Sequence, residues 1–180
     1  NIQLARHYGV RAWPHSGLTD AKAPSHEAGV QKLMTALPCI LAGGANIEPG
    51  LLSIDEVFSP VQMILDAELV SALQRALRGF EVTEETLAAD LIEAVGPGGF
   101  FTDRVHTARH FRESQWQPEI WSRDMLQHWL LDQSGIDVDR ARDKWYAVMA
   151  QPDPPPGIQP DVEGQLRSIV ARARGSLERF

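Results

Sequence analysis

The chain has 180 residues, 43% of them hydrophobic and 23% charged, which is the composition of an ordinary globular protein with room for one sizeable core. Its formal net charge of -7, without a basic stripe, argues against a nucleic-acid partner, because nothing would neutralise the phosphates. The longest apolar run, residues 36–42, contains Pro38 and is far too short to span a bilayer, so we expect no membrane partner either.

The single cysteine, Cys39, excludes an internal disulfide framework and favours a reducing, cytoplasmic location. The chain begins with Asn1 rather than Met, and no signal-peptide pattern follows. We therefore expect a cytoplasmic protein, and we expect this sequence to be a fragment of a longer one.

The first part of the chain alternates between short apolar runs and helical spacing. Residues 10–13, closed by Pro14, predict a strand that leads into a polar loop at residues 15–23. From Pro24 onward, apolar residues at helical spacing predict a helix that Pro38 kinks near its end. The apolar positions of this helix are Val30, Leu33, Met34, Leu37, Ile40 and Leu41.

Glycines and a second apolar run follow this helix. Gly43 and Gly44 end it, and residues 45–48 are a candidate strand that Pro49 and Gly50 stop. The order strand, loop, helix, strand is the signature of parallel βα architecture, so the sequence predicts an α/β fold.

The next helix carries the clearest local signals in the chain. Ser59 is its N-cap, Pro60 is its first residue, and Gln62 completes a capping box. Gly79 lies just beyond its C-terminus. We expect it to pack on a core through one apolar stripe, formed by Val61, Ile64, Leu65, Leu69, Ala72, Leu73, Ala76 and Leu77.

A further helix is predicted from Thr83, its N-cap, to Gly96, with inward positions Leu87, Leu91, Ile92 and Val95. The turn GPGG at residues 96–99 cannot continue a helix, because Pro97 lacks a backbone N–H and glycine tolerates positive φ. We expect at least one residue of this turn to have positive φ.

Two histidines follow the turn at a spacing of four. In a helix, His106 and His110 share one face. HxxxH is half of a zinc site, but the zincin motif also needs a Glu directly after the first His, where Thr107 stands. We interpret the pair as a polar junction, mostly buried against Glu113, Asp103 or backbone carbonyls, and expect no metal.

The last part of the chain is predicted to be helical. One helix begins at Ser122 with Met125, Trp129 and Leu130 inward, and another runs from Asp137 or Asp139 to about Ala150. We interpret the tryptophans of this part as packing residues: Trp116, Trp121, Trp129 and Trp145. Residues 151–160, which contain five prolines, predict an extended connector. Residues 161–179 predict an amphipathic helix that docks on an apolar surface.

Four runs of this sequence resemble the trimethylamine methyltransferase family, the corrinoid-dependent amine methyltransferases. They are GLTDAKAPSHEAG at residues 17–29, LAGGAN at 41–46, EVTEETLAADLIEAVGPGGFF at 81–101, and HTARHFRESQW at 106–116. The resemblance covers nearly the whole chain in matching order. It implies the C-terminal portion of a TIM (β/α)8 barrel, helix-rich, with a C-terminal helical extension.

The resemblance also implies three regions. Residues 1–96 hold the last βα units of a TIM-type barrel, residues 97–150 the glycine turn and a helical region, and residues 151–180 the connector and the C-terminal helix. The implied activity moves a methyl group from a methylated amine to the Co(I) centre of a corrinoid (cobalamin), as in methanogenesis-type methyl transfer. The corrinoid is carried by a partner protein, so no cofactor is expected to bind this chain tightly. A fragment need not be active alone, and homo-oligomerisation stays open.

Two departures from the family pattern point to a branch without pyrrolysine. The founding trimethylamine enzymes use pyrrolysine in or beside the loop that matches residues 19–22, and here those residues are ordinary. In the trimethylamine-type pattern a Glu follows the leucine where Ser53 stands. Several members of the other branch demethylate quaternary amines, which need no further activation because the amine already leaves as a neutral group.

In a TIM barrel the working loops follow the C-terminal ends of the strands, which places the site in residues 15–23 and 48–59. Asp20 and Glu48 are candidates to oppose the cation, and Trp13 is a candidate for cation–π contact. Lys22 and Asn46 complete the candidate substrate-binding set, and no catalytic residue is assigned. Each main candidate has a structural alternative: Asp20 as a helix cap, Trp13 as barrel packing, Glu48 as a solvated strand end.

Two other functions remain open at this point. One is a metal-dependent hydrolase that uses His106 and His110 with a carboxylate, which would need a third ligand and a general base. The other is a noncatalytic helical module. A barrel fragment without its first strands would expose the strand edge at residues 10–13, so a stable, monodisperse chain would favour the module.

Overall fold

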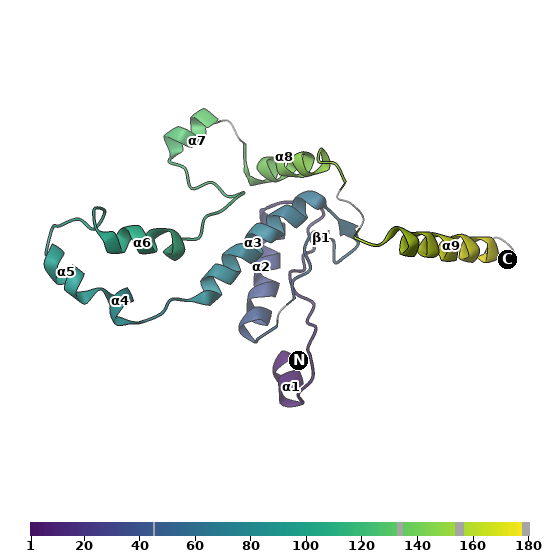
Figure 1. Cartoon of the computed structure of the whole chain (residues 1–180), viewed down its shortest axis with the longest axis horizontal. Coiled ribbons are helices and arrows are strands. Elements are labelled where there is room, and N and C mark those ends of the chain that lie inside the picture. Colours follow the sequence, from purple (N-terminus) through teal and green to yellow (C-terminus); the bar gives the residue numbers. More distant parts are fainter. Residues whose placement is uncertain (45, 133–134, 154–156, 178–180) are drawn as a thin grey trace. The chain divides into compact units, whose positions relative to one another are not determined.

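The computed structural model describes residues 1–44, 46–132, 135–153 and 157–177. The chain divides into two compact units, Asn1–Ala147 and Val148–Phe180. The described residues are rich in helix and contain few strand residues, in keeping with part of an α/β domain (Figure 1). The helices are α1 Ile2–His7, α2 His26–Leu41, α3 Pro60–Arg78, α4 Glu84–Leu87, α5 Ala89–Val95, α6 Val105–Ser114, α7 Leu126–Asp132, α8 Asp137–Met149 and α9 Pro160–Leu177.

The strands differ from those expected. Among the described residues the only sheet is a two-stranded antiparallel hairpin, β1 Leu51–Leu52 with β2 Val57–Phe58. Residues 10–13 form no strand, and neither do residues 46–48, while Ala45 lies outside the described residues. An extended segment becomes a strand only when it pairs with neighbouring backbone. Here the segments at 14–16 and 46–48 meet mainly through side chains.

Those contacts place residues 14–16, which follow the first expected strand, beside the second expected strand. The Asn46 amide donates a hydrogen bond to the Pro14 carbonyl, and the Ser16 hydroxyl donates to the Asn46 carbonyl. One backbone bond joins them, from the Glu48 N–H to the Ser16 carbonyl at 3.1 Å. The contacts to residues 46–48 therefore come from the residues just after the expected first strand, not from residues 10–13.

Helix α2 begins and ends close to where the sequence predicted. Ser25 caps it by accepting from the Ala28 N–H, Pro38 lies inside its last turns, and Gly43 beyond it has a φ of 94°. Two of the apolar positions that indicated the helix, Met34 and Leu41, are each 67% exposed. The face that is buried carries Ala28, Lys32 and Ala36.

Helix α3 repeats this pattern. Ser59 accepts from the Gln62 N–H, Pro60 is the first residue, and Gly79 follows the last turn, all as expected. The capping box is incomplete, because the Gln62 amide donates to Asp66 instead of returning to the cap. The buried positions of α3 are Gln62, Asp66, Glu68 and Leu73, so three of the four are polar.

The helix expected from Thr83 to Gly96 is divided in two. Thr83 and Thr86 form a capping box for α4, and Ala88 then takes a left-handed conformation with a φ of 48° before α5 begins. The expected turn is confirmed, since Gly96 has a φ of 65° and Gly98 one of 79°.

Residues 116–121, which follow α6, are bound to α3 through polar contacts. The Glu68 carboxylate, which is buried, accepts from the backbone N–H groups of Ile120 and Trp121 at 2.8 and 3.0 Å. The Trp116 indole donates to Ser71 and meets Trp121 edge-on, with ring centroids 5.3 Å apart. The packing interpretation is thus confirmed for this pair of tryptophans.

The helices after residue 120 are less buried than expected. Helix α7 begins at Leu126 rather than near Ser122, and Met125 and Leu130 are exposed rather than inward. Helix α8 matches its prediction. Its Asp139 accepts hydrogen bonds from the Ile136 N–H and the Arg142 guanidinium, which lower the pKa of this carboxyl group.

The second unit contains α9. Its start matches the prediction, whereas residues 154–156 of the expected connector and residues 178–179 of the expected helix lie outside the described residues. Val162, Leu166, Ile169 and Val170 are exposed. No helix in the described part of the chain is long and apolar enough to cross a lipid bilayer.

We predict that Gly98→Ala lowers the free energy of unfolding by about 1 kcal/mol. The added Cβ would meet no atom within 4 Å, so the cost is conformational, arising from the φ of 79°. Gly29→Ala is the matched control, because this glycine lies inside α2 with equally open space around it. The control should stabilise by about 0.5 to 1 kcal/mol. Denaturant midpoints measure both changes, and an unchanged midpoint for Gly98→Ala would contradict the argument.

Candidate functional site

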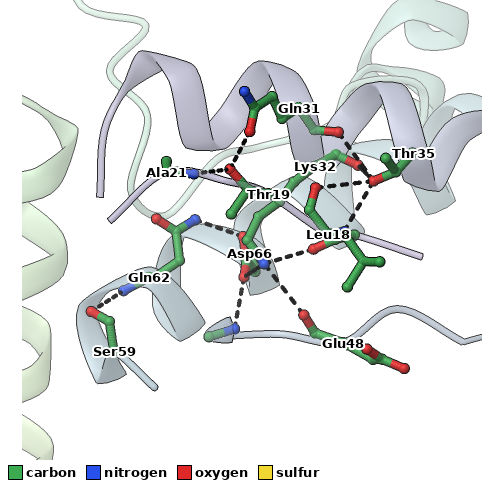
Figure 2. A network of polar contacts seen from close by, with 12 residues as sticks. Leu18, Thr19, Ala21, Gln31, Lys32, Thr35, Glu48, Ser59, Gln62 and Asp66 are labelled. Carbon is green, nitrogen blue, oxygen red and sulfur yellow. Dashed lines mark hydrogen bonds and ion pairs between the residues drawn. The ribbon is translucent and has the colours of Figure 1, made fainter. Parts of the chain in front are cut away.

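The loops at residues 15–23 and 48–59, where the sequence placed the site, meet above a buried ion pair. Lys32 of α2 and Asp66 of α3 are 1% and 2% exposed, and the Nζ–Oδ2 distance is 2.9 Å (Figure 2). The two helices pack against each other here. Lys32 fits because its neighbours one turn away, Ala28 and Ala36, are small enough to leave its side chain a path between the helices.

The pair binds backbone groups of both loops. Lys32 Nζ donates to the carbonyl oxygens of Gly17 at 2.8 Å and Glu48 at 3.3 Å. Asp66 Oδ2 accepts from the Gly50 N–H at 2.7 Å, and its Oδ1 accepts from the Gln62 amide at 2.7 Å. A buried charge is tolerated only when it is paired and hydrogen-bonded, and both of these are.

The first loop is also fixed to α2. Gln31 Oε1 accepts from the Thr19 hydroxyl at 2.7 Å and from the Asp20 N–H at 2.8 Å. Figure 2 shows this contact beside that of Thr35, whose hydroxyl accepts from the Leu18 N–H at 3.0 Å. Gly17 is needed because its φ is 77° and a Cβ there would come within 2.7 Å of Ile47.

The second loop contains three consecutive non-glycine residues in the left-handed region. Ser53, Ile54 and Asp55 have φ values of 52°, 51° and 71°. This conformation is costly, above all for a β-branched residue such as Ile54. The first loop compensates, because the Ala21 carbonyl accepts from the Ser53 N–H and the Thr19 carbonyl from the Ile54 N–H, at 2.9 and 3.0 Å.

Three ionisable side chains converge where the loops meet. His15 Nδ1 lies 3.2 Å from Glu48 Oε1. Asp55 joins them, so that the three potential ligand atoms lie within 4.8 Å of one another, the one such group of three among the residues that the structure describes. His15 and Asp55 are exposed, and the Glu48 side chain is only 19% exposed.

The sequence candidates fall in two places. Glu48 lies in this cluster, and Asp20 and Lys22 lie in the first loop, where Lys22 Nζ donates to the Asp20 carbonyl at 2.6 Å. Trp13 and Asn46 line a separate open pocket, which Arg6 and Gly43 also line. The Trp13 side chain is 75% exposed, so it is free to meet a ligand.

Sequence reasoning missed Lys32, Gln62 and Asp66, and did not single out His15 or Asp55. The available signal for the buried set was spacing: Gln62 and Asp66 are four apart, and Lys32 stands between two alanines at the same spacing. No local pattern brings His15 and Asp55 together, because they are 40 positions apart and only the fold joins them.

His106 and His110 do share one face of α6, as predicted, with ring centroids 4.5 Å apart. Both contact Glu85 of α4: His106 Nε2 lies 2.8 Å from its carbonyl oxygen, and His110 Nε2 lies 3.2 Å from its carboxylate. The expected burial is wrong, since both rings are half-buried. The backbone carbonyl expected as one possible partner is found for His106, whereas the carboxylate beside His110 belongs to Glu85 rather than to Asp103 or Glu113. In the described part of the chain they belong to no group of three potential metal ligands.

Comparison with known proteins gives a consistent result. The model of the family described as trimethylamine methyltransferase matches residues 1–178. The chain belongs to this family. Among its relatives are the trimethylamine methyltransferase MttB of Desulfitobacterium hafniense, 32% identical over 93% of this chain, and MttB of Methanosarcina barkeri, 31% identical over 95%. A glycine betaine methyltransferase of D. hafniense is 29% identical over 96%.

The chain spans about a third of the length of these relatives, since the matched region covers 34% to 36% of each. The match runs through both loops of the candidate site and through the histidine pair. The family resemblance drawn from the four sequence runs is therefore confirmed. The roles of individual residues stay predictions.

We predict that the purified protein contains no stoichiometric zinc. Both histidines of α6 already have protein partners. The group of His15, Glu48 and Asp55 offers only one nitrogen donor and no sulfur, whereas most zinc sites have several of these donors. Elemental analysis after gel filtration measures the metal content. One zinc per chain, removed by a chelator with loss of the fold, would contradict this and favour a hydrolase. His15→Ala and His110→Ala would then locate the site.

Proposed function

We propose that residues 1–180 are part of an enzyme that moves a methyl group from a quaternary amine to the Co(I) centre of a corrinoid on a partner protein. The observation that carries this proposal is the family match over residues 1–178, with relatives named for trimethylamine and for glycine betaine. In this proposal the corrinoid is a substrate that its own protein presents, and the chain holds no tightly bound cofactor.

The proposal includes the location and the architecture. Residues 1–96 contribute the last βα units of a TIM barrel, residues 97–150 a helical region, and residues 151–180 a C-terminal extension. The loops at 15–23 and 48–59 then lie at the mouth of the barrel, where enzymes with this fold bind their substrates. A cytoplasmic location, expected from the single cysteine, belongs to the same proposal.

The choice of a quaternary amine follows from the displacement chemistry. Reduced cobalt attacks the methyl carbon with its electron pair, a cobalt–carbon bond forms, and the carbon–nitrogen bond breaks with its electrons going to nitrogen. A quaternary ammonium leaves as a neutral amine, whereas a neutral tertiary amine must first be protonated or otherwise activated. The loop that matches the pyrrolysine region contains ordinary residues here, which favours the substrate that needs no activation.

The acidic loops support a cationic substrate. Glu48, Asp55 and Asp20 are among the carboxylates of the two loops. A quaternary ammonium has no N–H to satisfy, so it needs opposing charge and apolar or aromatic contact rather than hydrogen-bond acceptors. Trp13 offers an exposed indole nearby, and cation–π attraction is worth about 0.5 to 2 kcal/mol. Glu48 is the strongest candidate, because its side chain is the least exposed of the three and its backbone is held at both ends.

The choice of substrate can be tested directly. The protein that contains residues 1–180, given a corrinoid protein with cobalt reduced to Co(I), should demethylate a quaternary amine in preference to trimethylamine. Methyl–cobalt formation is followed by visible absorbance with glycine betaine, carnitine and trimethylamine. Turnover of trimethylamine alone would reject the substrate argument and leave the methyltransferase standing. No methyl–cobalt with any of these amines would reject both.

The role of Glu48 can be tested by substitution. Glu48→Gln should weaken binding of the quaternary amine by about 30-fold, roughly 2 kcal/mol, because a partly desolvated cation loses its counter-charge. Isothermal titration measures the affinity. Glu27→Gln is the matched control, since it makes the same change on α2 outside both loops, where a Gln can still accept from Gln31. Equal affinities for the two variants would exclude Glu48 from the cation site.

A further inference from the structure

We propose that Lys32 is a positioning residue for this amine site: its ammonium group sets the spacing between the two loops and so the direction of the Glu48 carboxylate. This inference rests on the proposed function. The Lys32 side chain lies between α2 and α3 and is only 1% exposed, so it would not contact the amine directly.

The hydrogen-bond count supports this role. An ammonium group donates three hydrogen bonds, and Lys32 Nζ has three acceptors: Asp66 Oδ2 at 2.9 Å, the Gly17 carbonyl at 2.8 Å and the Glu48 carbonyl at 3.3 Å. All its capacity is therefore used, two of the three bonds going to backbone of different loops. Asp66 extends the arrangement to Gly50, so one ion pair fixes both loops (Figure 2).

The anchored carbonyls lie next to the functional side chains. Glu48 presents its carbonyl to Lys32 and its carboxylate to His15, and its N–H is held by the Ser16 carbonyl at 3.1 Å. His15 lies two residues before the anchored Gly17. With the backbone fixed on both sides of its Cα, the carboxylate of Glu48 has a defined direction toward the other loop.

Stability alone does not explain a buried ion pair here. Removing two charges from water costs about as much as their attraction returns, and well-packed apolar residues often replace such pairs without loss. What apolar residues cannot do is hold two carbonyls and one N–H at defined positions. The pair therefore contributes geometry that a Met and a Leu would not supply.

The test uses the double variant Lys32→Met/Asp66→Leu in the whole protein. The matched control is Lys144→Met/Glu119→Gln, which removes an exposed ion pair between α8 and the segment before α7, where the Lys144 hydrogen bond lowers the pKa of Glu119. We expect the double variant to remain folded, with faster hydrogen exchange at the amides of Glu48 and Gly50. Its affinity for glycine betaine should fall at least tenfold by isothermal titration. The control should change neither quantity.

Each outcome decides the proposal. A folded double variant with faster exchange at these amides but with wild-type affinity would overturn it, and so would unchanged exchange. If the double variant does not fold, Lys32→Arg replaces it, because the guanidinium keeps the positive charge opposite Asp66 while its planar fork cannot reproduce the three directions of the ammonium donors. Wild-type affinity in folded Lys32→Arg with faster exchange would equally overturn it. If the wild-type protein binds no methylated amine, the proposed function fails instead, and the exchange data still report on loop positioning.

Discussion

The interaction on which this structure depends is the ion pair between Lys32 and Asp66. It joins α2 to α3 and holds backbone groups at Gly17, Glu48 and Gly50, so it connects the helices to the loops that they support. A core built in this way is unusual because its centre is charged, and the buried apolar residues around it are mostly alanines. Removing only Lys32 or only Asp66 would leave an uncompensated charge that is shielded from solvent, which is far more costly than removing both.

Helix caps and glycine turns could be predicted from the sequence because they depend on only a few neighbouring residues. The N-caps Ser59 and Thr83 and the positive-φ glycines of the turn at 96–99 are all found where expected. The errors concern what lies between these signals. The large apolar residues of α2 indicate a helix, but the face that is buried carries Ala28, Lys32 and Ala36. Which face is buried depends on the neighbouring helix, and a rule about spacing within one helix does not include that neighbour.

The candidate site could be predicted only in part for the same reason. Family resemblance and the barrel rule led to the two loops and to Glu48, and the structure adds its partners His15 and Asp55. Residues 10–13 and 46–48 have the composition of strands, but strand formation needs a partner backbone. Among the described residues, Asn46 instead has side-chain hydrogen bonds with Pro14 and Ser16. A hairpin formed at 51–58, where the turn lacks the glycine that usually marks one.

The left-handed turn of that hairpin also has a consequence for how the chain folds. Its strands are only four residues apart in sequence, so it counts as a local element. Yet three successive L-residues in a left-handed conformation are each disfavoured by about 1 to 2 kcal/mol, and an isolated two-stranded hairpin is marginal even with a favourable turn. The carbonyls that offset this cost belong to Thr19 and Ala21, more than thirty positions earlier. The hairpin is therefore expected to form after the first loop has closed on α2, as a late and non-local step.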